Sequence, residues 1–285
     1  MNIEITKSSR KAFFLTAILT GLFILTYLPV WKGLVTAWLG SDDYSHGFFI
    51  VPICGYIIWQ KKRVLKEIPL STSWWGLSLV VFFLFLYLFA HYGEILTLAS
   101  FSMVFMFCAL VIFFYGLRMF KELLFPLAFL LFMIPFPSQI YSQLTIPLQL
   151  FVTKVSVWFT ANLGMPIYRE GNVIHLPGRT MQVAQACSGL RSMLSILPLG
   201  AVLAYLTIKS NPIRYILFLS GIPTAIAVNI VRVILLVMAF YYLRFDLTVG
   251  SIHTIFGIFI FMLALIILFA IRGILLKWDV PSIKK

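Results

Sequence analysis

Long apolar runs separated by short polar connections cover most of the chain. Several of these runs approach or exceed the roughly 20 residues that a helix needs to cross a bilayer. Eight runs are predicted as membrane spans, at residues 12–30, 46–60, 74–90, 95–117, 122–134, 188–207, 213–242 and 253–271. The pattern therefore predicts an all-α polytopic membrane protein with about eight transmembrane helices.

The segment between the fifth and sixth predicted spans has a different pattern. Polar residues recur among the apolar ones from Gln139 to Gly164, which favours an amphipathic helix at the membrane surface over a further span. From Ile167 to Ala184 the sequence indicates two short extended pieces around a Pro177–Gly178 turn, like a β-hairpin. Because such backbone cannot face lipid, we expect it above the membrane or packed within protein.

No repeat, low-complexity tract or long linker divides the sequence. Residues 1–285 are therefore predicted to form a single integral-membrane domain. Within it, residues 12–137 hold five N-terminal spans, residues 139–186 an extracytoplasmic interfacial helix and hairpin, and residues 187–272 three C-terminal spans that carry the candidate site.

Composition excludes a soluble domain, because only 11% of the residues are charged and 61% are hydrophobic. A soluble domain carries about 25% charged residues. The net charge of +13 reflects cations in the short connections, the distribution expected for topology rather than for nucleic-acid binding. The strong clusters are Lys61, Lys62, Arg63, Lys66, Arg118, Lys121, Lys209, Arg214, Arg272 and Lys277. All of them lie in the cytoplasm, with both chain termini, if residues 139–164 stay outside.

Three chemically reactive residues are then predicted at one level near the outer surface. Cys187 stands at the start of the sixth span, Arg232 past the middle of the seventh, and His253 at the start of the eighth. A thiol at a membrane boundary reaches water and a cation, as a nucleophile requires. A charge inside the bilayer costs about 3 kcal/mol, so an intramembrane arginine usually faces protein and serves a purpose.

Each of these residues also has a structural alternative. Cys187 is a small packing residue in one interpretation, and His253 is a helix-start residue that bonds backbone carbonyls. Arg232 reaches the headgroups in another, or pairs with Asp246 or Glu170. Their shared depth favours the functional interpretation.

Two further polar residues are candidates for substrate binding. Arg191 follows Cys187 by four residues, which predicts a shared helix face, and Asn229 precedes Arg232 by three. No metal or other cofactor is predicted, because the four histidines lack paired ligand spacing: His46, His91, His175 and His253.

The stretches A-C-S-G-L-R-S at Cys187, N-I-V-R ending at Arg232 and H-T-I-F-G from His253 resemble the exosortase/archaeosortase family. Y-S-H-G-F at residues 44–48 is similar to the amino-terminal part of that family, so the resemblance covers residues 44–269. It implies a membrane-embedded cysteine protease or transpeptidase in the cytoplasmic membrane of a prokaryote. Its implied partners are exported proteins with carboxy-terminal sorting signals of the PEP-CTERM type: a short motif, often Pro-Glu-Pro, one membrane span and a basic tail.

The resemblance also implies roles. Cys187 would be the nucleophile, Arg232 the oxyanion stabiliser and His253 the proton donor and acceptor. The sequence departs from the family at Gln185, where members commonly carry an acidic residue. A multi-pass lipid or polysaccharide transporter (a flippase) and an envelope scaffold remain alternatives, and both should tolerate Cys187→Ala.

Overall fold

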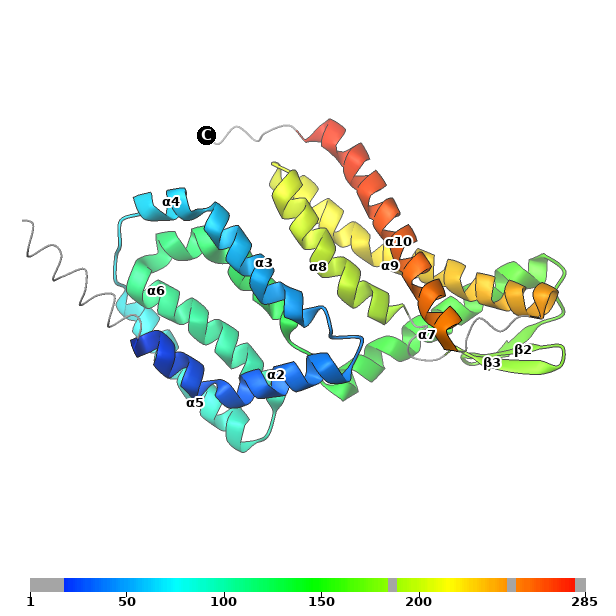
Figure 1. Cartoon of the computed structure of the whole chain (residues 1–285), viewed down its shortest axis with the longest axis horizontal. Helices are drawn as coiled ribbons and strands as arrows, with labels where there is room; N and C mark the ends of the chain where they lie inside the picture. Colours follow the sequence, from blue (N-terminus) through cyan, green and yellow to red (C-terminus); the bar gives the residue numbers. More distant parts are fainter. Residues whose placement is uncertain (1–17, 184–188, 245–249, 280–285) are drawn as a thin grey trace, which may run out of the picture. The chain divides into compact units, whose positions relative to one another are not determined.

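The computed structural model describes residues 18–183, 189–244 and 250–279 (Figure 1). Cys187 and Gln185 lie outside these residues. The chain divides into two compact units, Met1–Pro135 and Phe136–Lys285. Both are mainly helical and are taken separately below. The single domain over residues 1–285 stays a prediction.

Unit 1 contains helices and no strand among its described residues. They are Ile18–Thr26, α2 (Leu28–Gly40), α3 (Gly47–Gln60), α4 (Lys62–Glu67), α5 (Trp74–Tyr92), α6 (Leu96–Phe129) and the 3-10 helix η1 (Leu130–Met133). The first predicted span ends too early, at Val30, because the chain bends by 58° between the first two helices and continues to Gly40. Pro29 lies in the first turn of α2, where its missing N–H costs no helical hydrogen bond.

The long helix α6 contains a break at Gly116, next to the predicted boundary between the fourth and fifth spans. Gly116 has φ 85° and ψ 173°, far from helical values. A Cβ atom built there would lie 2.4 Å from the carbonyl oxygen of Ser71, so the backbone of another segment passes against the break. Only glycine accepts both this conformation and this contact.

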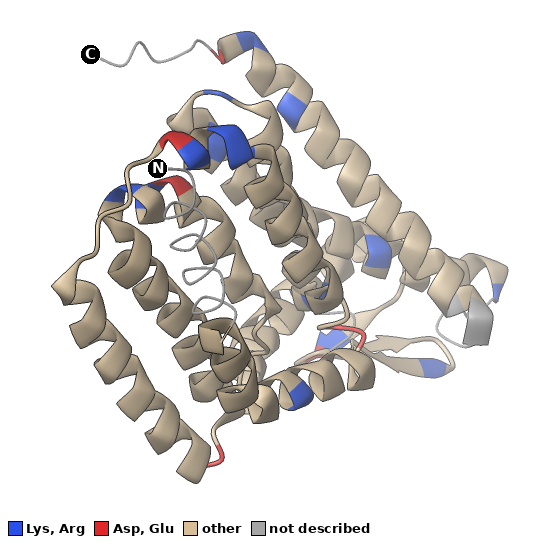
Figure 2. Cartoon of the chain, turned by 60° about the vertical axis from the view of Figure 1, so that its left-hand side comes forward, with Lys and Arg blue, Asp and Glu red and all other residues tan. Residues whose placement is uncertain are grey.

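Charged residues of unit 1 gather away from its long apolar helices. Figure 2 shows α5 and α6 with few charged residues along their length and a cluster of lysines and arginines around the short helix α4. Here Lys61 Nζ lies 3.0 Å from Glu122 Oε2, and Lys62 lies over the ring of Trp59 at 4.5 Å. The cluster is the one that the positive-inside rule assigns to the cytoplasm.

Unit 2 combines helices with a small sheet. Its elements are α7 (Ser138–Asn162), β1 (Tyr168–Glu170), β2 (Val173–Leu176), β3 (Arg179–Gln182), α8 (Leu190–Thr207), α9 (Asn211–Leu243), α10 (Gly250–Leu275) and η3 (Leu276–Trp278). The sheet is antiparallel with the order β1-β2-β3. The predicted Pro177–Gly178 turn is present, but the first extended piece is two strands, because Gly171 and Asn172 make a second turn between them.

The three C-terminal helices pack together through an apolar core. Its buried residues include Ile196 of α8, Val228 of α9 and Ile260 of α10. The carboxylate of Asp279 accepts the backbone N–H groups of Lys209 and Ser210, each at 2.8 Å. These bonds cap the start of α9 and hold the pKa of Asp279 below its usual value. The end of α10 is thereby tied to the turn between α8 and α9.

Among the described residues, six helices are long and apolar enough to cross a membrane, or seven if the bent pair counts as one span. The predicted eight counts differently: it adds the short helix α3, divides α6 in two and leaves α7 out. The all-α polytopic membrane fold is confirmed. Helix α7 itself has 25 residues and a mean hydropathy of 1.3. Whether it lies at the surface, as predicted, or crosses is not settled by length and composition.

Candidate functional site

Three of the five predicted site residues have described side chains. Arg232 and Asn229 belong to α9, and Arg191 lies in the first turn of α8. His253 lies in the first turn of α10 by its backbone, but its side chain lies outside the described part of the structure, as does Cys187. Direct distances between the three predicted catalytic side chains therefore do not enter the argument.

Arg232 and Asn229 share one face of α9, as their spacing predicts, and this face points into the protein. Arg232 is 7% exposed and Asn229 is 2% exposed. Both lie in the interior of a regular helix, Asn211–Leu243, where the backbone groups are already used by the helix itself. Burial of a guanidinium is expensive, so this placement calls for an explanation beyond helix formation.

Gly189, two residues after Cys187, lies directly against this face. It precedes α8 in a left-handed conformation, with φ 85°. A Cβ atom on Gly189 would lie 3.2 Å from both Cβ and Nδ2 of Asn229, closer than ordinary packing allows. Glycine therefore lets the chain turn and approach α9 at the same position. Two residues of extended chain reach at most about 7 Å, which limits how far Cys187 is from Gly189.

The other side of the undescribed segment 184–188 is also held against α9. Val183 is 2% exposed and belongs to an apolar cluster with Val233 and Val237. Val233 directly follows Arg232 in α9. The two described neighbours of segment 184–188, Val183 and Gly189, thus both pack on the part of α9 that carries Arg232.

The structure changes the interpretation of Arg191. Helix α8 begins at Leu190, after the left-handed Gly189, so Cys187 precedes the helix. The predicted sharing of a helix face by Cys187 and Arg191 is therefore wrong, because it assumed a helix that started at residue 188. Arg191 is partly buried. Its role in substrate binding, like that of Asn229, stays a prediction.

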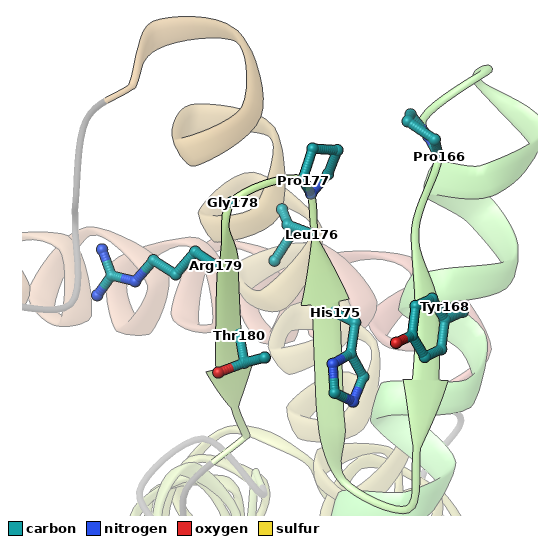
Figure 3. A pocket seen from close by; sticks show the side chains of 8 residues that line it. All are labelled: Pro166, Tyr168, His175, Leu176, Pro177, Gly178, Arg179 and Thr180. Atoms are coloured by element: carbon teal, nitrogen blue, oxygen red, sulfur yellow. The ribbon is translucent and has the colours of Figure 1, made fainter.

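A pocket of about 460 Å³ lies on one face of the small sheet (Figure 3). Tyr168, His175 and Thr180 stand opposite one another on the three strands. The rings of Tyr168 and His175 stack with centroids 4.5 Å apart and planes 7° apart. Pro166 and Pro177 also line the pocket. The pocket thus offers a flat aromatic surface beside a hydroxyl group, which suits a short peptide segment with a ring or apolar side chain.

Charged groups flank this pocket. Glu170 Oε2 lies 3.4 Å from Nε2 of His175, and the guanidinium of Arg179 lies 4.9 Å from the ring centre of Phe240 in α9. The sequence predicted the extended backbone here but not the pocket. The cross-strand pairing of Tyr168 with His175 depends on the turn at Gly171 and Asn172, which the prediction missed. A Gly-Asn pair between two apolar runs was the available signal.

The Y-S-H-G-F stretch of the sequence lies in unit 1 and makes structural contacts there. His46 Nε2 lies 3.1 Å from the carbonyl oxygen of Phe132, and Trp38 Nε1–H donates to that of Met133 at 2.9 Å. Thr97 Oγ1 donates to the carbonyl oxygen of Pro135 at 3.2 Å. These contacts satisfy carbonyl groups that the end of η1 leaves without helical partners. Burial lowers the pKa of His46 below its usual value.

Comparison with known proteins decides the family. Residues 38–270 match the family model described as transmembrane exosortase (Exosortase_EpsH), which is well over half of the chain. The chain belongs to the transmembrane exosortase family. The resemblance drawn from residues 44–269 is thereby confirmed. No curated protein and no solved structure matches the chain.

Family membership gives this exosortase a membrane transpeptidase-type role in general terms. The polytopic helices agree with a multi-pass membrane protein. Within the described part of the chain, no three His, Cys, Asp or Glu side chains gather at a possible metal site. The assignment of Cys187, Arg232 and His253 to catalysis stays a prediction.

Proposed function

We propose that the protein is a cysteine protease or transpeptidase that cleaves carboxy-terminal sorting signals of exported proteins at the outer face of the membrane. The observation that carries this proposal is the packing of Gly189 on Asn229, on the helix face where Arg232 is buried. It brings the chain beside the proposed nucleophile to a buried cation. A transporter gives no reason for this pairing of a thiol segment with an arginine.

The proposed reaction begins with the thiolate of Cys187, which attacks the carbonyl carbon of the scissile peptide. The tetrahedral intermediate collapses, the C–N bond breaks, and His253 donates a proton to the leaving amine of the tail. A thioester between Cys187 and the substrate protein remains. An acceptor, which is water, a lipid amine or a glycan, then gives its proton to His253, attacks the thioester and restores the thiolate.

Arg232 stabilises the oxyanion of both tetrahedral intermediates in this proposal. A fixed cation counts for more where protein excludes water, because the local dielectric constant is low. The 7% exposure of Arg232 supports such an environment. Removal of one oxyanion-stabilising group typically lowers the rate by about 10²- to 10³-fold.

We further propose that the short motif of the sorting signal binds at the pocket on β1–β3. The stacked rings of Tyr168 and His175 support this, because flat aromatic surfaces bind proline-containing segments. A photocrosslinker in the motif should label residues 167–184. Labelling that avoids this segment while the tail is still cleaved would remove the pocket from the proposal and leave the cysteine chemistry intact.

The proposed location is the cytoplasmic membrane of a prokaryote, with both termini in the cytoplasm. The cationic clusters at Lys61–Lys66, Arg118–Lys121 and Lys209–Arg214 support this topology. Substrate proteins would be anchored in the same membrane by the span in their sorting signal.

Co-expression with tail-bearing proteins of the same genome tests the proposed function. Wild type should shorten these proteins by the mass of the tail, and Cys187→Ala should leave them intact. Cys54→Ala is the matched control, because Cys54 is buried and its thiol donates to the carbonyl oxygen of Pro126 at 3.1 Å. Processing that survives in Cys187→Ala would reject the proposal in favour of a transporter or scaffold.

A further inference from the structure

Asn172 makes three contacts that link the sheet, α7 and the chain before Cys187. Its carbonyl oxygen accepts the N–H of Val183 at 2.9 Å. Its side-chain Nδ2 donates to the carbonyl oxygen of Val183 at 3.3 Å and to Oε1 of Gln149 at 3.2 Å. Asn172 therefore holds both backbone polar groups of Val183, the last described residue before segment 184–188.

Gln149 is the anchor of this arrangement. It is 6% exposed and lies on the buried face of α7, beside Thr145 and Thr153. The hydroxyl groups of those two threonines bond to carbonyl groups of α7 itself. The amide of Gln149 reaches instead to another element, and its Oε1 gives the second hydrogen of Asn172 a fixed acceptor.

The geometry points to Asn172 as a positioning residue for Cys187, an inference that rests on the proposed function. Asn172, braced by Gln149, holds Val183 at one end of segment 184–188, and the contact of Gly189 with Asn229 holds the other end. With both ends fixed on the part of α9 that carries Arg232, the nucleophile has little freedom to leave its attack position. Small displacements of a reacting group cost rate steeply, up to about 10²-fold per ångström.

The competing explanation is that Asn172 serves only the turn between β1 and β2. Asparagine, aspartate and glycine all suit such turns. Asn172→Gly keeps the turn and removes the amide. Asn172→Asp keeps the shape but replaces the donor with an oxygen that faces two acceptors, on Gln149 and Val183. A turn role predicts two silent variants, whereas the positioning role predicts two defective ones.

The first experiment measures thiol reactivity without any substrate. Purified full-length protein in detergent is treated with N-ethylmaleimide, and the alkylation rate of each cysteine is read by peptide mass. Both Asn172 variants should raise the rate at Cys187 by about tenfold, the effect of losing one or two hydrogen bonds. Cys54 and Cys108, which belong to unit 1, should react as in wild type. Asn162→Ala is the control, because Asn162 donates within its own helix, to the carbonyl oxygen of Trp158.

Gln149→Met gives a second, independent variant, since it removes the acceptor of Asn172 and leaves the turn untouched. It should raise the Cys187 rate in the same direction. The inference is overturned if Asn172→Asp or Gln149→Met leaves the Cys187 rate unchanged, or if the rates at all three cysteines rise together.

Tail processing supplies the second readout. The Asn172 variants should lower kcat by about tenfold to a hundredfold with KM little changed, because they displace the nucleophile and not the substrate. A wild type that cleaves no tail would reject the proposed function alone. The alkylation rates would still decide whether Asn172 positions the thiol.

Discussion

In unit 1, the side chains of Trp38, His46 and Thr97 satisfy carbonyl groups where η1 and the following residues leave them without helical partners. In unit 2, Arg232 is buried in the interior of α9, where the helix has already used the backbone groups. Both units bury polar side chains, but only in unit 1 does a break in the backbone account for it. A buried polar residue without such a break is the stronger candidate for function.

The same contrast applies to the cysteines. Cys54 is buried in α3 and donates to the carbonyl oxygen of Pro126, a structural role that requires no reactivity. Cys187 precedes α8 and is separated by two residues from Gly189, which lies on the helix face of Arg232. Position relative to helix ends and to a buried cation distinguishes the two thiols, which composition alone does not.

Arg232→Met makes the sharpest test of this contrast. It should lower tail processing by about 10²- to 10³-fold, because the oxyanion loses its cation. Thermal stability should stay the same or rise, since exchange of a buried charged group for an apolar side chain of similar size is often neutral or stabilising. Processing by mass and unfolding in detergent measure the two effects. A large fall in stability with processing retained by the folded protein would make Arg232 structural.

Gly189→Ala should have an intermediate effect. A left-handed alanine costs about 1–2 kcal/mol, and its Cβ would push against Asn229. We expect a lower unfolding temperature together with weaker processing. Gly257→Ala is the matched control, because a Cβ on Gly257 in α10 meets nothing within 4 Å. That variant should gain about 0.5–1 kcal/mol from the better helix propensity of alanine. Equal effects of the two variants would contradict the proposed contact.

His46→Ala should have the smallest effect, and it should depend on pH. At pH 7.5 the variant should lose about 1 kcal/mol of stability with the hydrogen bond to Phe132. The folded pKa of His46 is lowered, so the unfolded chain binds more protons, and the contribution of His46 falls as the pH drops below about 6.5. Unfolding at pH 7.5 and 5.0 should therefore show the difference between wild type and variant shrinking. His91→Ala, an exposed histidine of unit 1, should show no such trend. Loss of processing by folded His46→Ala would move this residue from structure to function.

Apolar run length and charge placement were enough to predict the helical membrane fold. The break in α6 was also predicted near its place, because Arg118 and Lys121 mark a span end in the sequence and Gly116 precedes them. The end of the first span was wrong, since Pro29 was taken as a terminator although proline also suits the first turn of a new helix. Local signals thus located most elements and misplaced boundaries where one residue type has two uses.

The candidate site was predictable only in part. The spacing of Asn229 and Arg232 gave their shared face correctly, because helical periodicity is local. The contact between Gly189 and Asn229 and the hold of Asn172 on Val183 join positions far apart in sequence or across a turn that the pattern did not indicate. The shared face of Cys187 and Arg191 failed because the left-handed Gly189 delays the start of α8. Contacts of this kind depend on tertiary packing, which a single sequence does not encode in any local pattern.

The most direct test of the central claim is to trap the bond that Cys187 is proposed to form. Purified protein is mixed with a carrier that ends in Pro-Glu-Pro, one apolar span and a basic tail, then quenched in acid and digested. The peptide containing Cys187 should gain the mass of the substrate remnant, lose it in hydroxylamine as a thioester does, and stay unmodified in Arg232→Met at the same time point. Cleavage accompanied by an adduct on another residue, or cleavage at the wild-type rate by Cys187→Ala, would contradict the account.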